Sequence, residues 1–152
     1  MAAPGLPMAP EALIVGFGRM GLEVARGLAA QGRDYVALVH NPGWVRTWRR
    51  WGLPVHFGDA TRGEVLQRLG VREAKVGIVC VDQPEAARQI VAAMRRHNPG
   101  LAIAVRARDE RHGGELRALG AAAAVTELHG PSRELTELAL RLMRDDRPTE
   151  PA

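Results

Sequence analysis

A glycine-rich segment near the start of the chain has the spacing of a phosphate-binding turn. Residues 16–21 follow the pattern GxGxxG. In such turns the first glycine, Gly16, permits a tight bend, the second, Gly18, lets a phosphate approach the backbone, and the third, Gly21, lets the next helix pack closely on the strand. The N-terminus of that helix offers free N–H groups and the positive end of its dipole to an anion. We therefore predict phosphate or dinucleotide binding here, the alternative being a purely structural turn.

The carboxylate that commonly holds the ribose hydroxyls of NAD is missing from its expected place. It belongs about 20 residues after the turn, at the end of the second strand, where the chain has Val39 followed by His40 and Asn41. Asn41 can hydrogen-bond a ribose hydroxyl and His40 can stack or bond nearby, but neither offers the charge-assisted bonds of a carboxylate. The absence weakens the prediction of NAD and leaves AMP, ATP and NADP-like ligands open. Three arginines are candidates for an extra phosphate, although a solvated helix face is the plainer interpretation: Arg46, Arg49 and Arg50.

Apolar runs typical of buried strands alternate with segments of helical periodicity along most of the chain. The expected strands are Ala12–Val15, Tyr35–Val39, Leu53–Phe57, Val76–Val81, Leu101–Val105 and Ala122–Val125. The expected helices run from about Leu22 to Gly32, from after the break at Asn41-Pro42-Gly43 to Gly52, and over Arg62–Leu69, Pro84–His97, Glu110–Leu119 and Ser132–Met143. This alternation predicts an α/β fold, a doubly wound six-stranded parallel sheet of Rossmann-like order 3-2-1-4-5-6. We expect a nucleotide-binding domain over residues 12–144, a flexible tail or linker over 1–11 and a polar tail over 145–152.

Length and composition are those of one ordinary globular domain. The 152 residues are 46% hydrophobic and 25% charged, and no apolar stretch reaches the roughly 18 to 20 residues that cross a bilayer. The net charge of +4 is modest for a nucleic-acid binder and suits small anionic ligands. The start of the chain does not resemble a signal peptide. The single cysteine, Cys80, excludes an intrachain disulfide and agrees with a reducing cytoplasm.

One segment interleaves aromatic residues with arginines, in a way that superficially suggests nucleic-acid binding. Trp44, Trp48 and Trp51 stand at i, i+4 and i+7, so they share one face of a helix. Such a stripe is more typical of a core or an interface than of a base-stacking platform. We expect no nucleic-acid partner.

Four motifs together resemble the nucleotide-binding regulatory domain of potassium transport systems, called RCK-N, KTN or TrkA-N. They occur in the family's order and at its intervals, over about Ala12 to Met143, and are closest to the version fused to Kef-type potassium/proton antiporters. The motifs are Gly16-Phe17-Gly18-Arg19-Met20-Gly21, Gly58-Asp59-Ala60-Thr61, Val81-Asp82-Gln83-Pro84-Glu85 and Arg106-Ala107-Arg108-Asp109.

The resemblance implies roles for several polar residues. Arg19 would lie beside the phosphates and Asp59 at the adenine end of the ligand, whereas a surface arginine and a helix N-cap are the structural alternatives. Asp82 would face the distal part of a dinucleotide. Arg106 and Arg108, after the fifth strand, would contact phosphate or a partner. The alternative is that one of these arginines pairs with a neighbouring carboxylate, Asp109 or Glu110. Glu127 is expected to be a surface carboxylate. The candidate binding residues are Gly16, Gly18, Arg19, Met20, Gly21, His40, Asn41, Asp59, Ala60, Thr61, Asp82, Arg106 and Arg108.

No motif indicates catalysis. The five histidines show neither the HExxH pattern nor clustered ligand spacing, and no serine nucleophile elbow occurs. Cys80 lies in an apolar run, where an inert buried thiol is expected. The histidines are His40, His56, His97, His112 and His129.

The resemblance therefore implies a non-catalytic cytoplasmic subunit or domain that senses an adenine nucleotide (AMP or ATP) or NAD(H). It would control a potassium transporter or antiporter and would lie at the inner face of the membrane that holds this partner. It also implies a homodimer, for which Leu140 broadens the apolar stripe of the last helix. A small NAD(P)-dependent oxidoreductase fragment is one alternative, and an interaction module with a decayed nucleotide pocket is another.

Overall fold

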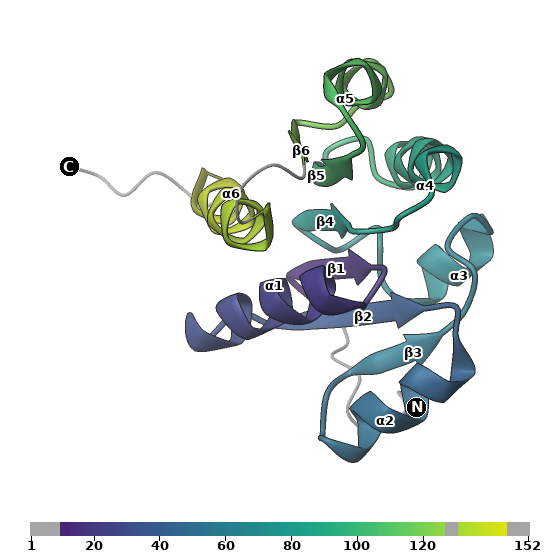
Figure 1. The fold of residues 1–152 in the computed structure, drawn as a ribbon, viewed down its shortest axis with the longest axis vertical. Helices are drawn as coiled ribbons and strands as arrows, with labels where there is room; N and C mark the ends of the chain where they lie inside the picture. The colour runs from purple at the N-terminus through teal and green to yellow at the C-terminus, as the bar shows by residue number, and fades with distance from the viewer. Residues whose placement is uncertain (1–9, 127–130, 146–152) are drawn as a thin grey trace.

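Six parallel strands form one sheet in the order β3-β2-β1-β4-β5-β6 (Figure 1). The computed structural model describes residues 10–126 and 131–145. The strands are β1 (Ala12–Val15), β2 (Tyr35–Val39), β3 (Val55–Phe57), β4 (Val76–Val79), β5 (Ala102–Ala107) and β6 (Ala123–Thr126). All five neighbouring pairs are parallel. The predicted fold class and strand order are confirmed.

Three helices cover each face of this sheet, which Figure 1 shows nearly edge-on. One face carries α1 (Arg19–Ala30), α2 (Pro42–Arg50) and α6 (Pro131–Asp145). The other carries α3 (Gly63–Arg68), α4 (Pro84–His97) and α5 (Glu110–Ala118). Because both faces are covered, the strands are apolar on both sides, which explains their continuous hydrophobic runs.

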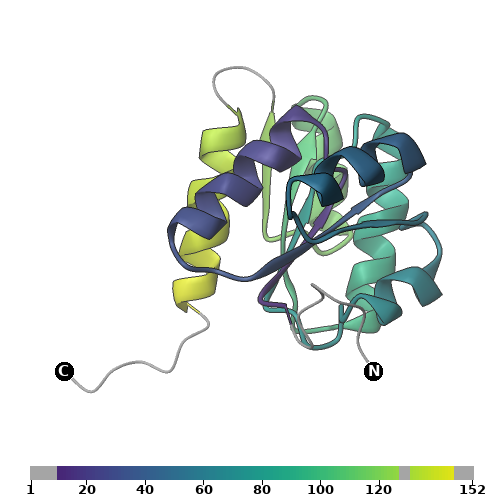
Figure 2. The same cartoon turned by 90° about the horizontal axis from the view of Figure 1, so that it is seen from below.

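The first strand shows how the two cores are separated. Ala12 and Ile14 are buried on the side of α1, and Leu13 and Val15 are buried on the opposite side. Successive side chains of a strand point to opposite faces, so four consecutive apolar residues fill two cores. Helices α1 and α6 lie side by side over one of them (Figure 2). A Cβ added at Gly27 of α1 would lie 2.3 Å from Cγ2 of Thr136 in α6, so this glycine allows the close packing.

The described residues include Glu11, which we expected in the N-terminal tail. Glu11 pairs with Arg33 at 2.9 Å, and its backbone carbonyl accepts hydrogen bonds from the N–H groups of Lys75 and Val76. Most of the expected tails, residues 1–9 and 146–152, lie outside the described residues. Within 10–126 and 131–145, no helix has the length and hydropathy needed to cross a membrane.

Several element bounds differ from the expectations, and β5, which extends to Ala107, includes Arg106 instead of ending before it. Strand β3 begins at Val55 instead of Leu53, because the N–H of Val55 bonds back to the carbonyl of Leu53 in a turn and Pro54 has no N–H to donate. The tryptophan stripe is only partly buried, since Trp48 is 8% exposed but Trp44 and Trp51 are 51% and 63% exposed.

Candidate functional site

The candidate residues of five strands, β1 to β5, gather at the carboxyl edge of the sheet. Parallel pairing aligns the strand ends, with Val15 opposite both Leu38 and Val79, and with Val39 opposite Phe57. The segments that follow these residues therefore emerge side by side. The chain order reverses between β1 and β4, which makes this edge the switch point where open α/β sheets bind ligands.

The glycine turn after β1 has the backbone geometry that its sequence predicts. Gly16 has φ of +88°, and a Cβ on it would lie 2.9 Å from the backbone carbon of Cys80. A Cβ on Gly21 would lie 2.3 Å from the carbonyl oxygen of Gly16. Side chains at these two positions would disrupt the turn, so both glycines are required by the fold.

The middle glycine has a different role, because it faces open space. Gly18 is exposed, and a Cβ on it would have no heavy atom within 4 Å. It is the N-cap of α1, whose first turn has no side-chain cap and no acidic residue. The uncapped N–H groups and the positive end of the helix dipole are therefore available to an anion. Arg19, the first residue of the helix, is exposed beside them, and Met20 is half-buried.

The end of β2 offers polar groups but no acid. Val39 is buried, whereas His40 and Asn41 are exposed. The side-chain oxygen of Asn41 accepts a hydrogen bond of 2.9 Å from the N–H of Gly43 and caps α2. The oxygen of Asn41 thus holds the helix, and its NH₂ group retains two N–H donors.

Asp59 after β3 closes a tight turn. Its carboxylate accepts bonds of 2.6 Å from the Thr61 hydroxyl and 2.9 Å from the Thr61 N–H. These two bonds lower the pKa of Asp59; burial opposes them with a smaller effect, and the still smaller electrostatic effects of Arg62 and His40 lower the pKa further, so the group is a carboxylate at neutral pH. The N-cap of α3 is Arg62, so the N-cap alternative for Asp59 does not hold. Ala60 is buried and Thr61 is half-buried beneath this turn.

At the ends of β4 and β5, Asp82 accepts a hydrogen bond of 2.5 Å from Arg106. Together with Arg108 they line a hollow of about 180 Å³. The alternative partner, Asp109, instead accepts a 2.8 Å bond from the N–H of His112 and caps α5. The remaining lining residues are Val81, Pro84, Ala107 and His112.

His112 is a positioning residue that our sequence reasoning did not identify. It is buried, its Nδ1 accepts a 3.0 Å bond from the N–H of Arg108, and its Nε2 lies 3.0 Å from the carbonyl of Pro84. Since the carbonyl can only accept, Nε2 carries the proton and the ring is neutral. The imidazole therefore joins the turn after β5 to the turn after β4. The sequence signal was weak: a histidine three residues after a capping aspartate.

The structure gives the surroundings of the Cys80 thiol and the grouping of possible metal ligands in the described part of the chain. Cys80 is buried, and burial raises its pKa to about 12 against a smaller lowering by the charge of Arg106. Among residues 10–126 and 131–145, no three His, Cys, Asp or Glu side chains are grouped to hold a metal ion. His129 and Glu127 lie outside the described residues.

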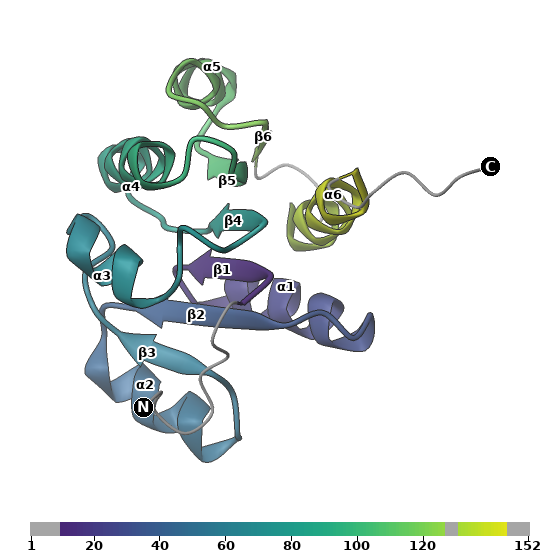
Figure 3. The same cartoon turned by 180° about the vertical axis from the view of Figure 1, so that it is seen from behind.

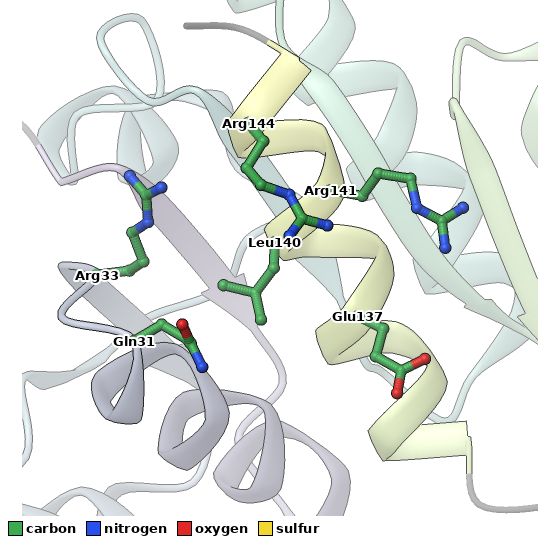
Figure 4. A pocket seen from close by; sticks show the side chains of 6 residues that line it. All are labelled: Gln31, Arg33, Glu137, Leu140, Arg141 and Arg144. Atoms are coloured by element: carbon green, nitrogen blue, oxygen red, sulfur yellow. The ribbon is translucent and has the colours of Figure 1, made fainter.

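A larger hollow of about 550 Å³ lies away from this edge, between the ends of α1 and α6 (Figure 4). Helices that follow parallel strands end at the amino edge of the sheet, so this hollow is on the side opposite the glycine turn. It is lined by Gln31, Arg33, Glu137, Leu140, Arg141 and Arg144.

These features define a Rossmann-like α/β domain with an open glycine turn at its switch point. The chain belongs to the TrkA-N domain family, whose model matches residues 12–127. The family predicted from the four motifs is confirmed.

Curated relatives are potassium-efflux proteins. Over 135 residues the chain is 39% identical to the "Glutathione-regulated potassium-efflux system protein KefC" of Cronobacter sakazakii, a match that covers 89% of this chain and 21% of that protein. The chain thus spans about a fifth of the length of this relative.

Two of the solved structures that share the fold are domains of about this chain's length. The TrkA-N domain of the inner membrane protein ybaL from Escherichia coli has a TM-score of 0.75 at 27% identity and covers 90% of this chain and 98% of its own. The Kef CTD of Shewanella denitrificans, solved in an AMP-bound form, has a TM-score of 0.69 at 29% identity and covers 88% of this chain and 87% of its own.

Proposed function

We propose that this chain is a nucleotide-binding regulatory domain of a Kef-type potassium efflux transporter. It binds an adenine nucleotide at the carboxyl edge of its sheet and transmits the bound state to a membrane partner. The observation that carries the proposal is Gly18, which lies open beside the uncapped N-terminus of α1. This anion site belongs to a chain 39% identical to a potassium-efflux protein.

The ligand's phosphate binds at the glycine turn, and its adenosine extends over β2 and β3. Backbone N–H groups of α1 bind the phosphate, with the Arg19 guanidinium beside them. Asn41 and His40 face the ribose. The Asp59 carboxylate accepts from the exocyclic amine of adenine or holds the turn of Ala60 and Thr61 that lies under it.

AMP and ATP are the first ligands to test, because a related Kef domain was solved in an AMP-bound form. The buried Val39 supplies no carboxylate to the adenosine ribose hydroxyls, which AMP, ATP and NAD(H) share. NAD(H) remains the second ligand to test, because the hollow at Asp82 and Arg106 offers a place for the distal half of a dinucleotide.

Regulation, not catalysis, is the proposed role. The domain acts as a homodimer on the cytoplasmic face of the membrane, next to the transporter that it controls. A homodimer suits this role because a two-fold assembly can match a symmetric membrane partner.

The deciding experiment identifies the ligand. Mass spectrometry of small molecules released from the purified protein, followed by calorimetry with AMP, ATP and NAD(H), should find an adenine nucleotide bound. A hydride-transfer assay with NADH tests the oxidoreductase alternative, and turnover there would overturn the proposal. No binding of any of these nucleotides would instead favour an interaction module with a decayed pocket.

A further inference from the structure

Helix α2 presents four large side chains to solvent at one end of the molecule. Figures 1 and 3 both show α2 beside β3, at the end of the sheet opposite α5. Trp44 and Trp51, the residue that caps the C-terminus of α2, stand seven residues apart on one side of the helix. Arg46 and Arg50 stand four apart and lie roughly 130° around the helix axis from the tryptophans, on the other flank of the exposed surface. All four are exposed. We call these four residues the α2 face.

The α2 face is cationic without local compensation. No Asp or Glu occurs from residue 35 to residue 58, a stretch that holds three arginines. The third, Arg49, is used within the fold, where it donates a 2.9 Å bond to the carbonyl of Val55 and lies 3.1 Å from Nδ1 of His56. Among the ion pairs of the described residues, none joins Arg46 or Arg50 to a carboxylate.

The exposed indoles are held in place by a buried one. Trp48 packs edge-on against Phe17 of the glycine turn with ring centroids 5.8 Å apart. Trp44 stacks on Trp48 at 5.6 Å, and Trp51 meets the same ring edge-on at 5.7 Å. Because these contacts already fix the exposed rings, docking them would cost little side-chain entropy.

Neither hollow described above includes a residue of α2. Indole rings favour the boundary between lipid headgroups and acyl chains. Arginines are attracted to anionic headgroups. We propose that the α2 face docks on an anionic lipid surface. This inference goes beyond nucleotide binding and does not rest on it.

The test measures binding of the purified chain to lipid vesicles by flotation. One vesicle set contains phosphatidylcholine alone and the other an equimolar mixture with phosphatidylglycerol. We expect binding to the anionic vesicles only, weakened by high salt because salt screens exposed charges. Paired Arg46→Gln and Arg50→Gln substitutions should lower that binding at least about tenfold, since each arginine near the surface contributes to the attraction. Paired Trp44→Ala and Trp51→Ala substitutions should lower it as well.

The matched control removes two exposed arginines elsewhere, Arg68 of α3 and Arg72 just after it, by substitution with Gln. This control should bind as the wild type does. Absence of binding to anionic vesicles overturns the proposal, and so does an equal loss in the control. Tighter binding to a single-stranded oligonucleotide than to the vesicles overturns it in favour of a nucleic-acid surface. If the tryptophan variant fails to fold, the arginine pair decides alone, with its thermal melting compared with that of the wild type.

Discussion

The guanidinium of Arg106 donates a 2.5 Å hydrogen bond to the carboxylate of Asp82, across the carboxyl ends of β5 and β4. The Asp82 side chain is 85% exposed and that of Arg106 only 18%. Because water solvates and screens the exposed carboxylate, the pair contributes little to stability. Its main effect is to fix the direction of the arginine at the edge where a ligand would bind.

Replacing Arg106 by Gln should therefore weaken nucleotide binding more than it weakens the fold. A charge-assisted hydrogen bond to phosphate is worth about 1.5–3 kcal/mol, so we expect roughly a tenfold or larger loss of affinity for NAD(H) in calorimetry. Asp82→Asn should lower the affinity for NAD(H) and leave that for AMP unchanged, because AMP lacks the distal half of the dinucleotide. Arg117→Gln, at an exposed position of α5, serves as the control. Wild-type NAD(H) affinity in Arg106→Gln contradicts the assignment.

The glycines of the turn should separate binding from stability. Gly18→Val places its side chain in open space, so the protein should keep its melting temperature and lose nucleotide affinity about a hundredfold as the phosphate is excluded. Gly21→Ala forces a Cβ against the carbonyl of Gly16 and should cost about 1–3 kcal/mol of unfolding free energy. Gly114→Val, which also meets no atom within 4 Å, is the control for an added side chain in open space. An unaltered nucleotide affinity in Gly18→Val would show that the phosphate does not bind at the glycine turn.

The sequence predicted the fold better than it predicted the site. Buried parallel strands and their helices leave a direct signal in hydrophobic periodicity, and all twelve elements were expected from it. The glycine turn was likewise expected, because only glycine tolerates the φ of Gly16.

The features that the sequence did not predict depend on contacts between distant segments. His112 gained its role from Pro84, 28 residues away, and no local pattern indicates such a bond. The partial exposure of the tryptophans had the same origin. Since α2 packs on β3, the last strand at one end of the sheet, only part of its aromatic stripe is covered.

Val39 is expected to set the preference among nucleotides. Val39→Asp places a carboxylate beside the ribose, where it can bind the hydroxyls of NAD(H) and repel the 2′-phosphate of NADP(H). Calorimetry should show that the ratio of the NAD(H) affinity to the NADP(H) affinity rises about tenfold. Val39→Asn, of similar size but uncharged, should shift the ratio much less. Because Val39 is buried, the aspartate should also destabilise the ligand-free protein by about 1–3 kcal/mol.

Cys80 should be unreactive while the protein is folded. Burial raises its pKa from the usual 9.0 to about 12, so the thiol stays protonated at pH 8. Iodoacetamide should label it only after denaturation. The raised pKa also makes stability fall as pH rises from about 9 toward 12, because the unfolded thiol ionises first and the folded one does not. Cys80→Ala should lack this part of the alkaline loss in urea unfolding, and rapid labelling of the native protein contradicts the assignment.

The last prediction concerns assembly through α6. Leu135, Ala139 and Met143 are fully buried against the sheet. Leu140, by contrast, is half-buried and points toward the end of α1 in the larger hollow (Figure 4). This leaves Leu140 on the part of α6 that a second copy could cover. We expect analytical ultracentrifugation to report about twice the 16.5 kDa chain mass at micromolar concentration.

Leu140→Arg should shift that mass toward the monomer without unfolding the domain, because the added charge would be buried unpaired in the dimer but can reach water in the monomer. Arg141→Gln, at an exposed neighbouring position, controls for a change of charge on the same helix. A wild type that stays monomeric with and without AMP would exclude the homodimer, and Leu140 would then serve only the packing of α6 on α1.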